Sequence, residues 1–592
     1  MAVNPLIRGG SFLLGSSEAE SVFTPEDFTE EQLMIAELTE QFVEGEVLPH
    51  DEKLEKQDFE LTVKLLRQMG TLGLLGADIP EVYGGADLDK ISSTLITEKL
   101  VRAGAFALSF GAHVGIGSLP IALFGNEQQK QRYLPKLVSG ETIAAYCLTE
   151  PTSGSDSLNA RTTAKLNPEG THYVLNGAKQ FITNAGFAGL FIVYAKVAGE
   201  KFTAFIVERE FSGVSTGPEE KKMGIKGSST RPLLLDEVPV PVENVLGEIG
   251  RGHVIAFNIL NIGRFKLAAG CAGSAKWALE LAIQYGKQRN QFGKPLIAFP
   301  LIQKKVADVA IRTYAAESMV YRTSGLIEAA MKPLDKEAPD YSRLVAKAVE
   351  EYAMECSLNK VFATECLDYA ADEGVQIHGG YGYIQEYMIE RIYRDSRINR
   401  IFEGTNEINR LLIPATLLRK AMKGELPLFQ AAERLQQELI AYVPAVSEDG
   451  ALAQETEMIG AAKKMFLMAG GMAVAKYGTE LDAEQEILES LANMIMEIYA
   501  AESALLRAVK ISERDGAEKG GLKSKMAQAF VHESFARIES AARTALAAMS
   551  DGDKLQTELS VLKKLTRFKQ VNLIALKRSI AAVHIAAGKY VT

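Results

Sequence analysis

The spacing of apolar residues changes twice along this chain, and this limits the folds it can adopt. From Thr29 the apolar residues recur at helical spacing, and Thr29 with Gln32 forms a plausible capping box. Between residues 145 and 247 they follow strand spacing instead. From Gly250 to the end helical spacing returns. The order helices, sheet, helices predicts an α+β fold and not alternating βα units.

The middle region is expected to be an antiparallel β domain. Within it, "HYVLNGAKQFITNAG" is interpreted as two short strands around an Asn176–Gly177 turn. The expected boundaries are 1–28 for an N-terminal arm, 29–145 for a helical domain, 146–248 for the β domain, 249–425 for a second helical domain and 426–592 for an additional helical domain.

Composition excludes several classes of protein. A chain of 592 residues exceeds what one hydrophobic core usually supports. A net charge of −10 argues against a protein held to nucleic acid by its overall field. The four cysteines lack CxxC spacing and fit a reducing compartment. The apolar run "MFLMAGGMAVA" is shorter than the roughly 20 residues that span a bilayer. We expect a soluble, cytoplasmic protein whose N-terminal segment is an ordered or fraying arm and not a signal sequence.

The common cofactor and catalytic motifs are absent from the sequence. There is no G-x-G-x-x-G after a strand, no G-x-x-x-x-G-K-[ST] and no G-x-S-x-G. The seven histidines never pair at H-E-x-x-H or similar spacing, so no metal site is predicted. A nucleotide cofactor would have to be held in another way.

Two segments near the start of the β domain carry candidate binding groups. The loop in "AYCLTEPTSGSD", residues 145–156, offers hydroxyls and backbone N–H groups that could bind pyrophosphate or the edge of a heterocycle. An inter-domain turn is the alternative. In "KQFITNAG", Phe181 and Thr183 are expected on one face of a strand. They could stack on a flat cofactor and donate a hydrogen bond to it; a core phenylalanine beside a surface threonine is the alternative.

A third segment, "RIFEGTNEINR", places Glu403 after Ile401 and Phe402 and before Gly404. The glutamate could mark a turn. It could equally be a base kept away from solvent, because apolar neighbours raise the pKa of a carboxyl group.

Together with "MGIKGSSTRPLLLDEVPVPVENVLG", "RNQFGKPLIAF" and "GVQIHGGYGY", these segments resemble the acyl-CoA dehydrogenase flavoenzymes in order and spacing. The resemblance covers about residues 30–420. "GAHVGIG", "LNIGRF" and the additional helical domain resemble the very-long-chain type. The resemblance to this family implies a helical domain, a β domain and a four-helix bundle that bind FAD. It also implies dehydrogenation of acyl-CoA to trans-2-enoyl-CoA in fatty-acid β-oxidation, with electrons passed to electron-transferring flavoprotein.

The resemblance further implies three groups of FAD-binding residues. The group at the flavin comprises Tyr146, Cys147, Leu148, Thr149, Gly154, Ser155, Phe181, Ile182 and Thr183. The group at the adenosine diphosphate half, held mainly for the neighbouring subunit, comprises Arg289, Gln291, Phe292, Gln376, Ile377, His378, Gly379 and Gly380. Thr405, Asn406 and Glu407 would contact the FAD of their own subunit. A surface salt bridge is the alternative for Arg289. Pro300 stands where shorter-chain relatives carry glutamine, and is left out of the site.

Glu403 matches the catalytic base of the family. Some relatives place the base just before the arginine of the segment that reads "LNIGR" here, but this chain has Gly263 at that position. Glu403 therefore has no rival. The residues expected on the substrate side are Ser155, Asn261, Arg264, Phe402 and Gly404. Helix capping and salt bridging are the alternatives for Asn261 and Arg264.

Two competing functions remain open at this point. An acyl-CoA oxidase would share the dehydrogenation step but give electrons to oxygen, and an assembly factor would keep the fold without the chemistry. Gly111, Ala112, Gly115 and Gly117 of "SFGAHVGIGSLP" predict a deep channel for long acyl chains, with close helix packing as the alternative.

The additional helical domain contains a basic amphipathic helix, "LKKLTRFKQVNLIALKR". Peripheral membrane contact is one interpretation. A solvated face of a packed domain is the interpretation that we favour. If the domain covers the bundle surface that pairs dimers in tetrameric relatives, the protein is a homodimer.

Overall fold

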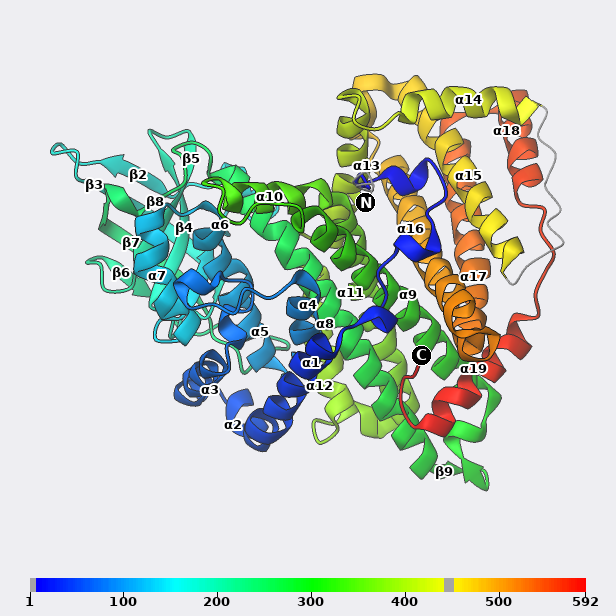
Figure 1. Ribbon diagram of the computed structural model, residues 1–592, viewed down its shortest axis with the longest axis horizontal. Helices are drawn as coiled ribbons and strands as arrows, with labels where there is room; N and C mark the ends of the chain where they lie inside the picture. The colour runs from blue at the N-terminus through cyan, green and yellow to red at the C-terminus, as the bar shows by residue number, and fades with distance from the viewer. Residues whose placement is uncertain (1–6, 441–451) are drawn as a thin grey trace.

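The computed structural model describes residues 7–440 and 452–592. Residues 1–6 of the expected arm and 441–451 of the additional helical domain lie outside the described residues. Figure 1 shows the sheet and the N-terminal helices on one side, long helices in the centre, and the additional helices on the other side. The predicted order of helices, sheet and helices is confirmed.

The N-terminal domain begins with the expected capping box. The Thr29 N–H donates to Gln32 Oε1 (3.0 Å), and the Gln32 N–H donates to Thr29 Oγ1 (3.2 Å). A π-helical segment, Ala112–Ser118, joins two of the helices. The helices are α1 (Glu30–Phe42), α2 (Asp51–Glu55), α3 (Phe59–Thr71), α4 (Lys90–Lys99), α5 (Ala105–Gly111), α6 (Leu119–Phe124) and α7 (Glu127–Ser139).

The middle domain is one eight-stranded sheet in the order β6-β7-β3-β2-β4-β5-β8, with β1 also paired to β4. Its strands are β1 (Ala144–Cys147), β2 (Thr163–Leu166), β3 (His172–Thr183), β4 (Leu190–Val197), β5 (Lys201–Glu208), β6 (Val214–Thr216), β7 (Thr230–Pro241) and β8 (Val245–Leu246). Most neighbours are antiparallel as expected, but β1 and β2 both run parallel to β4. The sheet is therefore mixed. Side-chain periodicity is the same in both kinds of pairing, so it does not fix strand direction.

The expected Asn176–Gly177 turn is wrong. These residues lie inside the single strand β3, which pairs with β7 along its length. The register shifts between Leu175 and Gly177, where Gly177 has a φ of 153°. A second shift lies between Lys179 and Ile182. The signal read as a turn marks a β-bulge, which also bends a strand but does not end it.

The long central helices form the bundle that follows the sheet. A short hairpin of β9 (Asn290–Gln291) and β10 (Lys294–Pro295) extends from its end. The helices are α8 (Gly252–Gln288), α9 (Pro300–Met331), α10 (Tyr341–Glu351), α11 (Ala353–His378), α12 (Met388–Ser396) and α13 (Asn406–Met422).

The additional domain packs its helix α16 against α9 and α13 of the bundle. The domain consists of α14 (Leu428–Ile440), α15 (Ala453–Tyr477), α16 (Gln485–Asp515), α17 (Ala517–Met549), α18 (Gly552–Leu565) and α19 (Leu573–Ala587). Three described helical stretches are long and apolar enough to cross a membrane by composition alone, namely Ala105–Phe124, Gly252–Gln288 and Ala453–Ala483. Within their most apolar windows 72%, 67% and 50% of the residues are buried inside the protein, so much of this apolar surface packs internally.

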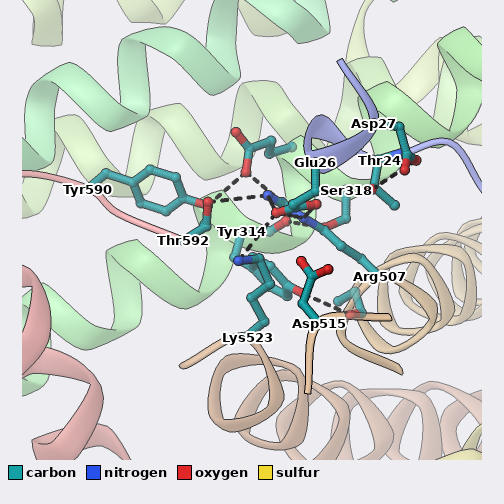
Figure 2. A network of polar contacts seen from close by, with 12 residues as sticks. Thr24, Glu26, Asp27, Tyr314, Ser318, Arg507, Asp515, Lys523, Tyr590 and Thr592 are labelled. Atoms are coloured by element: carbon teal, nitrogen blue, oxygen red, sulfur yellow. Dashed lines mark hydrogen bonds and ion pairs between the residues drawn. The ribbon is translucent and has the colours of Figure 1, made fainter. Parts of the chain in front are cut away.

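The described part of the N-terminal arm is ordered and lies at the interface with the additional domain. Phe12 and Leu13 are buried, and the Gly10 N–H donates to Glu355 Oε1 (2.7 Å). Farther along, Glu26 joins a buried charge network around Arg507 of α16, shown in Figure 2. The Arg507 guanidinium binds Glu26 at 2.7 Å and Glu317 of α9 at 2.6 Å. This network ties the arm, the bundle and the additional domain together.

Candidate active site

Glu403 lies in a turn with an uncommon backbone conformation. Its φ is 55°, and that of Gly404 is 78°. A left-handed conformation costs free energy in a residue other than glycine and persists only where neighbours hold it. Arg264 Nε donates to the Glu403 carbonyl (3.0 Å), while Lys360 Nζ (2.7 Å) donates to the Gly404 carbonyl. Asn409 Nδ2 also donates to the Gly404 carbonyl (2.9 Å). The surrounding helices therefore fix the turn and with it the direction of the Glu403 side chain.

The carboxylate of Glu403 occupies the space beside Gly263 of α8. A β-carbon added to Gly263 would lie 2.5 Å from Oε2, a separation that packed atoms do not tolerate. The absence of a side chain at Gly263 thus provides the room for the Glu403 carboxylate.

The environment of Glu403 suits a general base. Its Oε2 atom is buried and has no hydrogen-bond partner among the described residues. Burial raises the pKa of Glu403 to about 7, and the nearby charges of Arg264 and Lys360 only partly oppose this rise. A base whose pKa lies near the working pH combines a large deprotonated fraction with a strong pull on the proton.

Glu403 borders a cavity of about 250 Å³ between the N-terminal helices, α8 and α12. Phe402 and Thr183 also line it. Of the four small residues expected along a channel, Gly111, Ala112 and Gly115 line the cavity. Gly117 does not. A β-carbon on Gly117 would lie 2.8 Å from the Ala144 β-carbon, so this glycine serves close packing against β1, which is the alternative interpretation.

A second hollow, of about 530 Å³, lies at the far end of the bundle. Arg289 and Gln291 border it beside the segment Gln376–Gly380, so these predicted residues come together. His378 stacks on Tyr285 with ring centroids 4.3 Å apart. No atom lies within 4 Å of the place where a β-carbon would stand on Gly379 or Gly380. The backbone here is open to close approach by a ligand.

Family models cover most of the chain. The acyl-CoA dehydrogenase N-terminal domain matches residues 29–141 and the middle domain matches 145–238. Two models described as the acyl-CoA dehydrogenase C-terminal domain match 250–418 and 461–564. A probable acyl-CoA dehydrogenase of Bacillus subtilis (strain 168) is 58% identical over 583 residues, which cover 98% of each chain. The chain belongs to the acyl-CoA dehydrogenase family.

Two further relatives refine this assignment. The crystal structure of an acyl-CoA dehydrogenase from Bacillus anthracis, complexed with FAD, is 58% identical. It superposes with a TM-score of 0.98 over 99% of this chain and 100% of that chain. The mitochondrial very long-chain specific acyl-CoA dehydrogenase of Macaca fascicularis is 43% identical over 364 residues, which cover 60% of this chain and 52% of that protein.

Acyl-CoA dehydrogenases are FAD-dependent oxidoreductases, and the residues of this chain fit that cofactor. Arg289 offers a guanidinium, which suits paired phosphate oxygens, at the edge of the hollow at the far end of the bundle. Thr183 lines the cavity that contains Glu403, as a group facing both flavin and substrate would. Phe181 is 61% exposed and Phe292 is 93% exposed, so both rings present free faces.

Several residues predicted to bind FAD have no side chain free to do so. The side chains of Cys147 and Ile182 are buried in the core of the sheet, because they point to its packed face. Asn406 Oδ1 accepts from Lys360 Nζ (2.7 Å), and its Nδ2 donates to Thr364 and Glu365 (both 3.1 Å). These three residues can contribute only backbone groups.

The other predicted flavin residues differ in their exposure. Gly154 and Ser155 are exposed in the loop after β1, and Leu148 is buried. The Thr149 carbonyl accepts from the Gln180 N–H (2.9 Å). The ring of Tyr146 packs edge-on against Tyr194, at 5.4 Å.

The N-terminus of α13 keeps two of the predicted residues near the Glu403–Gly404 turn. Thr405 caps this helix by accepting a hydrogen bond from the Ile408 N–H (3.2 Å), and Glu407 is exposed in its first turn. Phe292 is absent from the linings of both cavities; its ring lies edge-on to Phe299 at 6.1 Å.

Asn261 and Arg264 lie close to the Glu403 turn. Both are buried and neither lines the cavity at Glu403. Arg264 Nη1 donates to Asn261 Oδ1 (3.0 Å), and Arg264 Nε holds the Glu403 carbonyl. Arg264 thus supports the Glu403 backbone, and Asn261 orients Arg264.

Sequence reasoning missed Lys360, which holds the same turn from α11. Its side chain is fully buried. The available signal is a lysine that directly precedes the apolar run Val361–Phe362–Ala363, where a charge needs a partner.

Proposed function

We propose that this protein is an FAD-dependent dehydrogenase of long-chain acyl-CoA thioesters. It forms the trans-2-enoyl-CoA product in fatty-acid β-oxidation and passes electrons to electron-transferring flavoprotein. The observation that carries the proposal is the unpaired carboxylate of Glu403, with its raised pKa, at the wall of a largely apolar cavity. This arrangement suits removal of a weakly acidic α-proton from a substrate with an apolar tail.

The residues of the chain have separate tasks in this reaction. Glu403 accepts the α-proton of the thioester at its carboxylate. Bound FAD supplies the acceptor for the hydride that leaves the β-carbon. The backbone N–H of Glu403 donates to no described backbone carbonyl, so it remains free for the thioester oxygen. A donor in this position stabilises the negative charge that develops on that oxygen as the proton leaves.

The extent of the cavity along α8 supports a long acyl chain. Residues lining it recur on one face of this helix, from Gly263 beside the base to Trp277. At about 1.5 Å per residue these two are about 21 Å apart along the helix axis. The hydrocarbon core of a bilayer, two acyl chains deep, is about 30 Å thick, so one chain of a membrane lipid needs about 15 Å. The cavity thus has the length for a chain of that size.

The experiment is rapid anaerobic mixing of the flavin-loaded protein with palmitoyl-CoA, followed by flavin absorbance. Loss of the absorbance within the first turnover is expected. A flavin that stays oxidised with palmitoyl-CoA and with shorter thioesters would favour the assembly factor. Electron-transferring flavoprotein should reoxidise the reduced flavin. In air without this acceptor, the reduced protein should form no peroxide. Fast peroxide formation would favour the oxidase.

A further inference from the structure

Lys360 of α11 is a fully buried lysine whose bonds converge on the Glu403–Gly404 turn. Its Nζ donates to the Gly404 carbonyl and to Asn406 Oδ1, both at 2.7 Å. Burying an ammonium group is costly even when it is hydrogen-bonded. A neutral side chain could pack here at lower cost, so the positive charge itself calls for an explanation.

The groups that face Glu403 come from three elements. Arg264 lies on α8, Lys360 on α11 and Tyr146 on β1. Arg264 donates to the Glu403 carbonyl and to the side-chain oxygen of Asn261. Lys360 donates to the Gly404 carbonyl and to the side-chain oxygen of Asn406. Among the described residues neither cation forms a hydrogen bond with the carboxylate, and both act on it only through their charge. The two positive charges therefore lower the pKa of Glu403 while its carboxylate oxygens stay free of hydrogen bonds to them.

The environment of Lys360 brings the pKa of its ammonium group close to neutral pH. Burial lowers the pKa of Lys360 to about 8, while Cys271 of α8, Glu403 and Glu407 of α13 oppose the fall. At neutral pH the side chain is therefore still mostly protonated. Its effect on Glu403 is to lower the pKa of the carboxyl group against the larger effect of burial.

We propose that Lys360 is a positioning residue for the base. It fixes the left-handed Glu403–Gly404 turn through the Gly404 carbonyl, and its positive charge favours the deprotonated form of Glu403. The inference rests on the proposed function, since it assigns Lys360 to the reaction in which Glu403 is the base.

The test measures the rate of flavin reduction by palmitoyl-CoA against pH in three variants. Lys360→Gln keeps a donor for the Gly404 carbonyl but removes the charge. The pH midpoint of its rate should rise by about one unit, the size of effect that a single nearby charge produces. Lys360→Arg keeps the charge and should keep the midpoint. Lys360→Met removes both the donor and the charge. Its rate of flavin reduction at neutral pH should fall roughly 10- to 100-fold, as expected for a misplaced catalytic group.

Thr364→Val is the matched control. Thr364 is buried on the same helix and binds Asn406, but it does not contact the Gly404 carbonyl. This variant should lose thermal stability much as Lys360→Gln does, yet keep the wild-type midpoint. An unchanged midpoint in Lys360→Gln, or an equal shift in Thr364→Val, would overturn the inference. Failure of the wild-type protein to reduce its flavin would instead overturn the proposed function.

Discussion

Gly263 and Glu403 are packed so closely that a β-carbon on the glycine would lie 2.5 Å from the carboxylate. Gly263 sits inside helix α8, where alanine is more favourable than glycine by about 1 kcal/mol. Gly263→Ala should therefore still fold, because this preference offsets part of the cost of moving the carboxylate, but Glu403 should be displaced. We expect a fall of roughly 100-fold in the rate of flavin reduction, as for a 1 Å misplacement.

Gly270→Ala is the control for this substitution. It lies on the same helix, and its β-carbon would meet the nearest atoms at 3.9 and 4.0 Å, which is ordinary contact. Near-normal flavin reduction is expected. If Gly263→Ala were as active as Gly270→Ala, the carboxylate would have to reach the substrate from another direction.

Because the pKa of Glu403 is raised, a rise in pH should change the activity and the stability of the protein in opposite directions. Because the folded pKa of about 7 lies above that of an unfolded glutamate, the folded state holds an extra proton between these values. The stabilisation that this proton provides is lost as the pH rises through about 7. Activity should rise over the same interval, because the deprotonated form is the base.

Glu403→Gln separates the two effects. It should retain flavin, reduce it at least roughly 10²-fold more slowly, and show a melting temperature that changes less than that of the natural protein between pH 5 and 8. Melting curves at several pH values test this. Normal flavin reduction by the glutamine variant would assign the base to another residue.

Gly111 borders the acyl cavity, and no atom lies within 4 Å of the place where its β-carbon would stand. Gly111→Leu should fill this space and shorten the channel. Each methylene excluded from the cavity should cost about 0.8 kcal/mol, roughly fourfold in kcat/KM. The loss should grow with chain length from octanoyl-CoA to palmitoyl-CoA. Gly117→Ala should instead lower stability and leave the chain-length profile unchanged.

Removal of the Arg507 guanidinium should take one buried cation from the carboxylates of Glu26 and Glu317, which would keep Lys523 (3.4 Å) and Lys276. Arg507→Met is expected to cost about 3–5 kcal/mol of unfolding free energy, as for a broken buried ion pair. Arg514→Met, which removes a more exposed cation near Asp27, should cost at most about 1 kcal/mol. Denaturant unfolding compares the two. Equal losses of unfolding free energy in the two variants would show that the buried network contributes little to stability.

The same network predicts acid sensitivity. Arg507 holds the pKa of Glu26 below its usual value, and Lys276 together with Arg507 holds that of Glu317 well below it. Lowered carboxyl pKa values stabilise the folded state above the unfolded pKa, and this contribution is lost as the pH falls. The natural protein should therefore lose stability below about pH 4 more steeply than Arg507→Met does.

The order of the domains follows from local patterns, and so does the hypothesis that Glu403 is the base. Strand spacing marks the middle domain, and the segment around Glu403 is distinctive enough to match a family. Other features depend on contacts between distant residues. The charge of Lys360 acts on a turn 44 residues away in sequence, a relation that no local pattern records.

Strand detail was the least predictable part. Phe181 has a φ of 59° in a bulge, so a two-residue repeat could not fix which way its ring points. The family resemblance places Cys147 at the cofactor with its neighbours, but alternate residues of a strand face opposite sides. Only the direction in which β1 enters the sheet decides which of these residues faces the core.

The pairing of Glu26 with Arg507 has a consequence for synthesis of the chain. These residues are 481 positions apart, and ribosomes add about 5–20 residues per second. The arm therefore leaves the ribosome about 25–100 s before its partner helix exists. During that interval Phe12 and Leu13 have no finished surface to cover them. The arm can dock on α16 only after that helix is made, so its apolar side chains are open to a nascent-chain chaperone throughout this interval.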